Sequence, residues 1–404
     1  MKKYTLLTLF VLLSVSVFSA TRYWVGGGSS SNFSATGNTN WSTTSGGANN
    51  ASVPTVSDDV IFDGVGASGN TAAICSATIS FKSLTFTSGY TNTITLNAVL
   101  TIAGDFTDRP EHTWAGASGI AITANSTITS NGKTFPNAVT FSTSTTTKTL
   151  SGNWTIGGLF TTNGAHVNQV INGDTLILAG TVSIDGSTTA GTATIRLTGT
   201  LYESFNNSTL HNDILIDGDM TITTIVVKGG KSLKYLSGNI INTVQLSCLD
   251  TCTIDVAGIS WNNVSFDDKT TINSLVTSNY VLFGTSALGN ILAGPYGFVT
   301  GELWYTGSSG VILQDNINTP TATYTINTLL RFPYMPSRFI QSSDPVYKAK
   351  LILGPNSNQD NLGSFTRIDA SVGKPIFTYK GIITDCINVV SLTQPPTISN
   401  SFAN

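Results

Sequence analysis

The amino-acid sequence predicts an all-β solenoid, a rod in which short parallel strands stack coil upon coil. The first observation behind this prediction is a repeated pair of apolar residues, two positions apart and followed by Gly, Asn or Asp. Side chains two apart on an extended chain point to the same face, so each pair offers one narrow apolar edge to a core. Stacking many such edges buries them all. Between Val167 and Val227 the pairs are Leu176 and Leu178, Val182 and Ile184, Ile195 and Leu197, and Ile214 and Ile216, and a further apolar pair, Met220 and Ile222, comes directly after the last of these turns.

The second observation is the composition. Only 10% of the 404 residues are charged, against roughly 25% in an average globular protein. The long polar tracts use Ser, Thr, Asn and Gly, and of these Thr, Asn and Gly are poor helix formers whereas Thr suits strands. The net charge of −3 supplies no basic field that would hold nucleic acid. The composition therefore favours a sheet-built rod and argues against a nucleic-acid partner.

Residues 1–20 are typical of a secretory signal peptide. Two lysines precede the apolar run Leu6–Phe18, which is shorter than the ~20 residues that span a bilayer. Cleavage is expected near Ser19 or Ala20, and the alternative is a buried first strand. No later segment is long and apolar enough for a membrane helix, so we expect a secreted or cell-surface protein without a transmembrane helix in its mature chain.

Residues 21–71 are predicted to form an N-terminal cap. The first coil of a solenoid exposes an apolar cross-section and unpaired strand edges, which invite aggregation unless they are covered. Trp24, Trp41 and Phe62 are large enough to cover them.

Residues 22–64 also contain, in order, Tyr-Trp-Val-Gly-Gly, Asn-Trp-Ser, Ser-Gly-Gly and Pro…Asp-Asp-Val-x-Phe-Asp. This order resembles a recurrent N-terminal module of secreted bacterial and phage-associated β-helix surface proteins. The resemblance implies a right-handed parallel β-helix of the pectin-lyase-like type and an exterior location, but no reaction. A serine- and asparagine-rich insert before Trp41 departs from the pattern and leaves the role of that loop open.

Residues 72–330 are assigned to the parallel β-helix. At roughly 20–25 residues per coil, they would make about ten to thirteen coils. The charged and aromatic segment Asp108–Trp114 contains Pro110 and is expected to protrude from the stack as a loop. The strands expected first are Ile74–Ile79, Leu84–Thr87, Ile94–Leu96 and Leu100–Ile102.

Phe135–Phe141 and Trp261–Phe266 share a form that suggests internal repetition, and Phe205–Leu210 is a weaker third copy. In each, an aromatic and a later apolar residue flank an asparagine turn. Asparagine tolerates left-handed geometry, and stacked asparagines can form amide ladders.

Residues 331–404 are predicted to form a C-terminal strand-rich cap or small β module. Arg, Lys and Pro become frequent after Pro320, where the coil pattern ends. Arg338–Leu353 and Thr366–Asn388 resemble, more loosely, the closing segment of the same β-helix surface proteins.

Four cysteines fit an exported protein without defining a disulfide scaffold. A turn through Asp250 could bring Cys248 and Cys252 within the ~4.4–6.8 Å Cα separation that a disulfide requires. Cys75 and Cys386 lie far apart in the sequence and are expected to be isolated thiols. Zinc is not expected, because no second cysteine or histidine pair lies near the close pair.

Five aspartates are candidates for chemistry. Asp217 and Asp219, two apart on one strand, would share a face at roughly the 5–9.5 Å that glycoside hydrolysis requires, although Asp-Gly-Asp is commoner as a turn. Asp58, Asp59 and Asp63 could bind calcium, and the alternative is that they accept backbone hydrogen bonds in turns. The sequence indicates no other cofactor.

The sequence contains no Gly-x-Ser-x-Gly elbow, phosphate loop or His-Glu-x-x-His helix. The histidines, His112, His166 and His211, are expected to be turn or surface residues. Aromatic side chains could stack on sugars, and the alternative is packing at coil corners; the candidates are Trp114, Trp154, Trp261, Trp304 and Tyr305.

The residues favour a non-catalytic secreted or cell-surface protein of structural or adhesive function. Its lateral face or loops would contact a glycan, a cell surface or copies of itself. One alternative is a carbohydrate-active β-helix enzyme, a polysaccharide lyase or glycoside hydrolase, because this fold hosts such sites. Another is a phage appendage subunit, which the resemblance suggests but a signal peptide does not.

Overall fold

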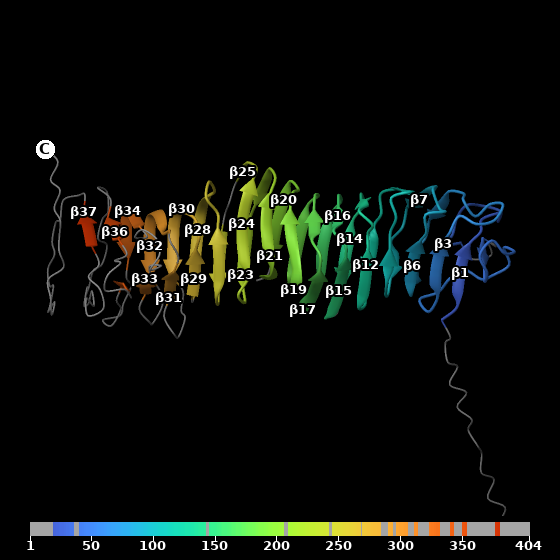
Figure 1. The fold of residues 1–404 in the computed structure, drawn as a ribbon, viewed down its shortest axis with the longest axis horizontal. Helices are drawn as coiled ribbons and strands as arrows, with labels where there is room; N and C mark the ends of the chain where they lie inside the picture. Colours follow the sequence, from blue (N-terminus) through green and yellow to red (C-terminus); the bar gives the residue numbers. More distant parts are fainter. Residues whose placement is uncertain are drawn as a thin grey trace, which may run out of the picture.

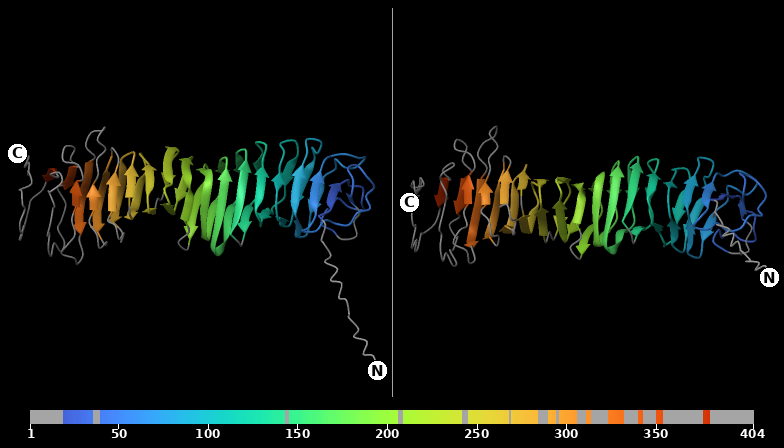
Figure 2. Two further views of the ribbon diagram at one scale, coloured as in Figure 1. Left: turned by 60° about the horizontal axis from the view of Figure 1, so that its bottom comes forward. Right: turned by 90° about the horizontal axis from the view of Figure 1, so that it is seen from below.

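The chain folds as a β-solenoid of about ten turns (Figure 1). The computed structural model describes residues 19–35, 40–142, 145–205, 209–241, 245–267, 269–283, 290–293, 296–305, 311–313, 323–331, 340–342, 350–353 and 376–379. In these ranges the secondary structure is strands and turns, without a helix. The predicted all-β solenoid is therefore confirmed, and Figure 2 shows the same rod from two further sides. Most of the predicted signal peptide, residues 1–18, lies outside the described residues.

Parallel pairing between successive coils arranges the strands in rows along the rod. The first row contains β1 (Thr21–Trp24), β3 (Asp59–Phe62), β6 (Ser83–Phe86), β9 (Phe106–Thr107), β12 (Ser126–Thr129), β15 (Thr146–Ser151), part of each of β17 (Phe160–Gly173), β19 (Val182–Leu197) and β21 (Thr209–Asp217), then β23 (Thr224–Lys228), β26 (Gln245–Leu249), β28 (Ser260–Asp267), β30 (Val276–Phe283), β32 (Phe298–Tyr305), β34 (Thr323–Arg331), β36 (Lys350–Leu353) and β37 (Ile376–Tyr379). The second row contains β5 (Ile79–Phe81), β8 (Leu100–Ile102), β11 (Ile120–Ile122), β14 (Val139–Ser142), the first parts of β17 and β19, β20 (Leu201–Phe205), β22 (Met220–Ile222) and β25 (Ile240–Ile241).

A third row is divided in two. β4 (Ala73–Cys75), β7 (Thr93–Leu96) and β10 (Thr113–Ala115) form a separate three-stranded sheet. Its continuation contains β13 (Thr134–Phe135), β16 (Trp154–Ile156), β18 (Leu176–Leu178), the ends of β19 and β21, β24 (Ser232–Ser237), β27 (Cys252–Asp255), β29 (Lys269–Ile272), β31 (Asn290–Ala293), β33 (Val311–Leu313) and β35 (Ile340–Ser342). The remaining strand, β2 (Trp41–Ser42), pairs antiparallel with β1.

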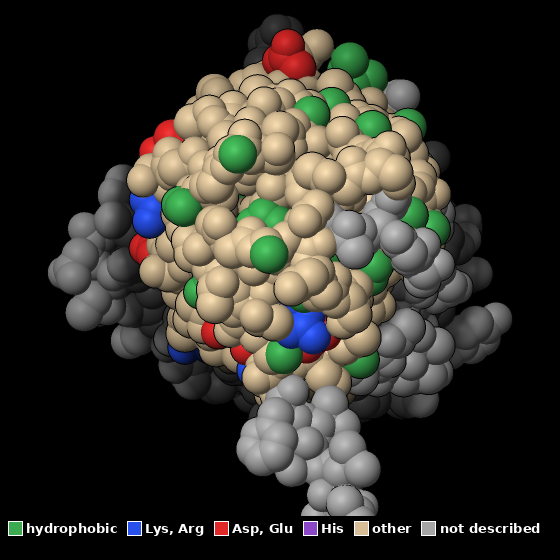
Figure 3. Space-filling view, turned by 90° about the vertical axis from the view of Figure 1, so that its right-hand side faces the viewer, with side chains coloured by type: hydrophobic (Ala, Val, Ile, Leu, Met, Phe, Trp, Pro, Cys, Tyr) green, Lys and Arg blue, Asp and Glu red, His purple; other side chains and the backbone are tan. Residues whose placement is uncertain are grey.

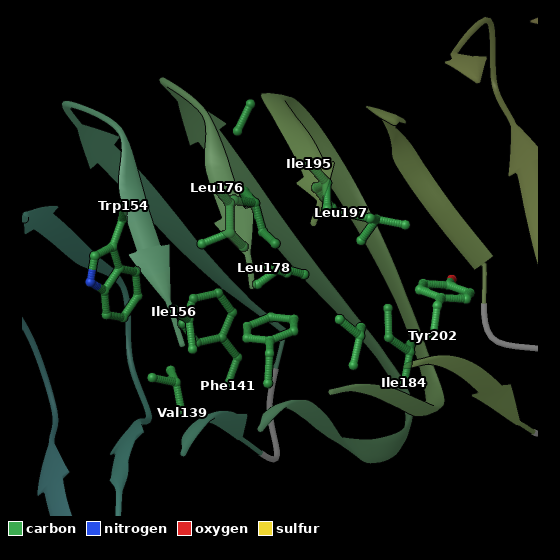
Figure 4. Close-up of a cluster of buried hydrophobic side chains, with 14 of the residues drawn as sticks. Val139, Phe141, Trp154, Ile156, Leu176, Leu178, Ile184, Ile195, Leu197 and Tyr202 are labelled. Atoms are coloured by element: carbon green, nitrogen blue, oxygen red, sulfur yellow. The ribbon is translucent and has the colours of Figure 1, made fainter. Parts of the chain in front are cut away.

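The core is a set of apolar columns that run along the rod axis. In β16, β18 and the end of β19, Trp154, Leu176 and Ile195 occupy equivalent positions in register, and all three are buried. Figure 4 shows such side chains converging from successive coils. Because alternate residues of each strand face inward, the apolar pairs that the sequence singled out are buried, as predicted.

Leu178→Ala should lower the melting temperature clearly, because Leu178 is almost fully buried in β18. Such truncations of buried leucine usually cost about 2–5 kcal/mol through lost transfer energy and a cavity. Thr181→Ala, in the partly exposed turn three residues later, is the control and should change little. Equal small effects in thermal denaturation would contradict the strand register.

The insert that the sequence left unassigned covers a strand edge of the first coil. The Phe33 N–H donates to the Ile74 carbonyl at 2.9 Å, and the Ile74 N–H donates to the Ser31 carbonyl at 2.8 Å. The insert thus adds a parallel bridge to the outer edge of β4, while β1 pairs with β3. Beneath them lies a cluster of buried aromatic rings, Trp24, Phe33, Trp41, Phe62 and Phe81. Figure 3 looks at this end of the rod and shows only scattered hydrophobic side chains.

Asn40 holds the insert in place. Its Oδ1 accepts the Gly28 N–H at 2.8 Å, and its Nδ2 donates to the carbonyls of Ser30 at 2.8 Å and Asn32 at 3.2 Å. A Cβ at Gly28 would lie 2.5 Å from Asn40 Oδ1, so this close approach requires glycine. The Asn40 amide therefore hydrogen-bonds to three backbone groups of the irregular loop.

Asn40→Ala should loosen the cap, because the side chain is 1% exposed and its backbone partners lose their bonds. Leaving buried polar groups unsatisfied costs roughly 1–3 kcal/mol. We expect a lower melting temperature and more end-to-end association in light scattering. Asn50→Ala, at an exposed position of the same cap, is the matched control, and an equal effect there would contradict the role of Asn40.

The parallel stack extends past both predicted boundaries. β3 pairs in parallel with β6 inside the range 21–71 that was assigned to the cap. β36 pairs with β34, and β37 with β36, inside the range 331–404 that was predicted as a separate C-terminal cap or module. Coil strands are thus built from sequence that lacks the clear glycine-punctuated pattern of the central region.

At the corners, asparagine and aspartate side chains bind the backbone of the following coil. A side-chain oxygen accepts an N–H from a residue 19–22 positions later in the chain. In each pair the backbone N–H of the first residue donates to the side-chain Oδ1 of the second. The pairs are Thr91 and Asn70, Thr127 and Asp105, Thr147 and Asn125, Thr175 and Asn153, Thr192 and Asn172, Ser232 and Asp213, and Asn239 and Asp219. Asp174 differs, because its Oδ2 accepts the N–H of Gly152, which lies in the preceding coil.

These bonds differ from the predicted amide ladders, although one amide-to-amide bond joins Asn279 to Asn262 at 3.2 Å. The proposed repeats also differ from one another. Asn137 lies at a corner between β13 and β14, whereas Asn262 and Asn263 lie inside β28 and form no turn. The third copy, Phe205–Leu210, includes residues outside the described part of the chain.

Candidate functional site

Asp217, at the end of β21, is held by two neighbours. Its Oδ1 accepts from Ser237 Oγ at 2.6 Å, and its Oδ2 accepts from Arg196 Nε at 2.9 Å and also from Nη2. The hydrogen bonds from Ser237 and Arg196 hold the pKa of this carboxyl below its usual range. A general acid of a glycosidase needs a raised pKa, so Asp217 lacks the protonation state that this role requires.

Asp219 lies in the exposed turn between β21 and β22. Its Oδ1 accepts the backbone N–H of Asn239 at 2.6 Å. The Asp-Gly-Asp segment is therefore a turn whose two carboxylates each bind a different group of the next coil. The turn interpretation of this segment is confirmed.

The three calcium candidates also serve turns and strand edges. Asp58 Oδ2 accepts from Thr55 N at 2.8 Å and Thr55 Oγ1 at 2.9 Å, and Asp63 Oδ1 accepts from Val65 N at 3.0 Å. Asp59 accepts from Ser83 Oγ at 2.6 Å and forms an ion pair with Lys82 at 3.1 Å. Across the described ranges, no group of three His, Cys, Asp or Glu side chains is placed to hold a metal ion.

The tryptophans proposed to stack on sugars face inward where the structure describes them. Trp154 and Trp261 are fully buried, and Trp114 is 7% exposed. Trp154 stacks on Phe141 with ring centroids 6.4 Å apart. Corner and core packing, the alternative interpretation, is therefore correct for these three rings, because strand alternation directs them into the rod. Trp304 and Tyr305 belong to β32, and their side chains lie outside the described part.

Segment Asp108–Trp114 was predicted to protrude as a loop, and its turn residues Pro110 and Glu111 are exposed, but other side chains of the segment are buried. Asp108 and His112 are fully buried between β9 and β10. Asp108 Oδ2 accepts from Trp114 Nε1 at 3.0 Å, and its Oδ1 accepts the Arg109 N–H at 2.8 Å. The His112 ring stacks on Phe86 with centroids 4.0 Å apart. These bonds and the ring contact hold the Asp108 and His112 side chains inward, so His112 lies in the bend but is not a surface residue.

The Asp108 and His112 side chains form a buried pair in which both groups are mostly uncharged between about pH 3 and pH 7. Burial raises the pKa of Asp108 to about 7 and, together with the nearby Lys133 charge, lowers the pKa of His112 to about 3. His112 Nε2 lies 3.2 Å from Asp108 Oδ1, but the two atoms form no hydrogen bond, and a neutral imidazole makes no ion pair. Because both side chains are closed off from solvent, the pair cannot reach a substrate and has a structural role.

The stability of Asp108→Asn relative to the natural chain should rise as the pH is raised from 5 to 8. A carboxyl whose folded pKa is raised contributes stability that is complete below its unfolded pKa near 4 and is lost as the pH rises through about 7. At ~1.4 kcal/mol per pKa unit the loss would reach at most about 4 kcal/mol. His112, whose lowered pKa acts in the opposite direction, is present in both proteins and largely cancels in the comparison.

Denaturant titrations at several pH values would measure this difference. Asp105→Asn is the matched control, because Asp105 is exposed and binds a backbone N–H that asparagine can also bind. A pH-independent difference between Asp108→Asn and the natural chain would contradict the buried-carboxyl interpretation.

The outer faces of the rod carry neutral hydroxyl columns. We name two of them by their rows. The second-row column is Ser80, Thr101, Ala121, Thr140, Thr161 and Ser183, each in register with the next. The first-row column is Thr85, Thr107, Thr129 and Ser151. Coils in a β-stack repeat at ~4.8 Å, so the first-row column presents a hydroxyl group on every coil at nearly constant spacing, and the second-row column does so except at Ala121.

The described part of the chain contains no helix that is long and apolar enough to cross a membrane. Comparison with models of protein families found no match. Comparisons with curated proteins and with solved structures also found none.

Proposed function

We propose that the protein is a non-catalytic, secreted or cell-surface rod of structural or adhesive function whose lateral face contacts a glycan or a cell surface. The observation that carries the proposal is the pair of uncharged hydroxyl columns. Each hydroxyl can donate one hydrogen bond and accept others. An extended partner could therefore form many weak contacts at once, and their combined strength would exceed that of any single one.

A carbohydrate-active enzyme is the second candidate, and the carboxylates argue against it. Asp217 is engaged by Arg196 and Ser237, and Asp219 by a backbone N–H. The inward orientation of Trp114 and Trp154 removes two of the rings expected to grip a sugar. Binding through hydroxyl and amide groups, without cleavage, fits these features better.

The proposal includes export by a signal peptide in residues 1–20 and a right-handed coil of the pectin-lyase-like type. Crossovers between parallel strands of one sheet are right-handed in about 98% of connections, which favours a right-handed coil. The resemblance of residues 22–64 supports a secreted bacterial or phage-associated surface protein. Self-association of the rod is compatible with all of these features.

The mature chain should be retained by at least one polysaccharide or cell-surface preparation without releasing sugar or unsaturated product. Thr101→Glu with Thr140→Glu places charges in the second-row column, and Thr107→Glu with Thr129→Glu does so in the first-row column. If one column binds, only its variant should lose retention, by roughly tenfold or more, since several contacts fail together. The other variant is the matched control.

Retention by none of the surfaces, or equal retention by both variants, would contradict the binding proposal. Release of sugar that Asp217→Asn with Asp219→Asn abolishes would establish the enzyme instead.

A further inference from the structure

Two cysteines face each other across one corner of the rod. Cys248 is the fourth residue of β26, and Cys252 begins β27. Between them, Asp250 adopts a φ of 58°, a left-handed conformation that reverses the chain and that few residues other than glycine and asparagine adopt readily. Both cysteines point inward, with 0% and 1% exposure. The turn that the sequence predicted through Asp250 is thus present.

The two inward-facing side chains interact across this corner. The interaction with Cys252 contributes to the raised pKa of the Cys248 thiol, and Cys252 Sγ lies 3.4 Å from Thr270 Oγ1. In the neighbouring coils, Val227 and Phe266 occupy the positions equivalent to Cys248, and Thr270 the position that follows Cys252. The sulfur pair is therefore specific to one coil and is not part of a column.

Catalysis and metal binding do not account for the pair. The interaction with Cys252 and burial hold the pKa of Cys248 well above its usual range, so it is not a thiolate nucleophile in the folded chain. Within the described ranges no third metal-binding side chain joins the two sulfurs. Packing alone does not require two thiols at this corner, since the equivalent positions are filled by valine, phenylalanine and threonine.

We propose that Cys248 and Cys252 are oxidised to an intrachain disulfide in the exported protein. The export rests on residues 1–20, and the proposal is independent of any ligand of the hydroxyl columns. The described cysteines, Cys75, Cys248 and Cys252, are buried free thiols, whereas Cys386 lies outside the described residues. The interaction across the corner selects Cys252 as the partner of Cys248.

The oxidant is a small disulfide such as glutathione disulfide. One cysteine thiolate attacks it, forms a mixed disulfide and releases one glutathione thiolate. The second cysteine thiolate then attacks the cysteine sulfur of the mixed disulfide, the Cys248–Cys252 bond forms, and the second glutathione leaves. Two thiols thus lose two protons and two electrons, and glutathione disulfide is reduced to two thiols. Because both cysteines are buried in the folded chain, this exchange takes place before the coil closes.

The disulfide would restrain the unfolded chain around the Asp250 corner, which is how most disulfides stabilise. The mature chain is refolded from the reduced, denatured state in a glutathione redox buffer, alkylated in denaturant and mapped by peptide mass spectrometry. We expect a peptide that contains a Cys248–Cys252 link, two hydrogens lighter than its reduced form, with Cys75 and Cys386 alkylated. Thermal denaturation should then show a lower melting temperature in strong reductant.

The double variant Cys248→Ala with Cys252→Ala is the control, and its melting temperature should not depend on reductant. Peptide mapping of the natural chain decides the question even if that variant does not fold. Alkylation of both Cys248 and Cys252 after refolding, or a link from either to Cys75 or Cys386, would overturn the proposal. Neither result bears on retention by a glycan, so the two proposals fail independently.

Discussion

Parallel backbone pairing between successive coils is the constraint on which the rest of this structure depends. A three-residue strand such as Leu176–Leu178 buries little by itself, so each coil gains its core only by stacking on the next. Pairing fixes the register, and the register places apolar residues in inward columns and hydroxyl residues in outward ones. The first coil has no predecessor, which is why a cap of aromatic rings and irregular loop covers it.

The sequence predicts the inward residues well because strand periodicity is local. Leu178 and Ile184 are buried because their apolar partners lie two positions away, a pattern that needs no knowledge of neighbours. The prediction failed at Asp108 and His112, where charge and a nearby proline indicate an exposed loop. Those groups are buried because Trp114 and a backbone N–H bind the carboxyl, and these contacts depend on how the chain turns in three dimensions.

In the candidate site, too, the pattern within one strand could be predicted, whereas the contacts between coils could not. The sequence could identify Asp217 and Asp219 as two neighbouring acids, but Arg196 and Ser237 reach Asp217 only because coils stack at intervals of about 20 residues. The direction in which the tryptophan side chains point could not be predicted for a related reason. Trp154 could face either side of its strand, and the inward side is fixed by the register with Leu176. Functional groups on a solenoid are thus defined by the stack more than by the strand that carries them.

The corner bonds from asparagine and aspartate give the rod a direction. At most of these corners the acceptor precedes its donor in the chain, as with Asn153 and Thr175. During synthesis, each new coil would therefore meet an acceptor already held by the coil before it, so that growth from the capped end is templated. A chain that stopped at such a corner would leave a side-chain oxygen for water to solvate. If a coil that carries an acceptor were missing, a backbone N–H of the following coil would lose its partner, as Thr175 would without Asn153.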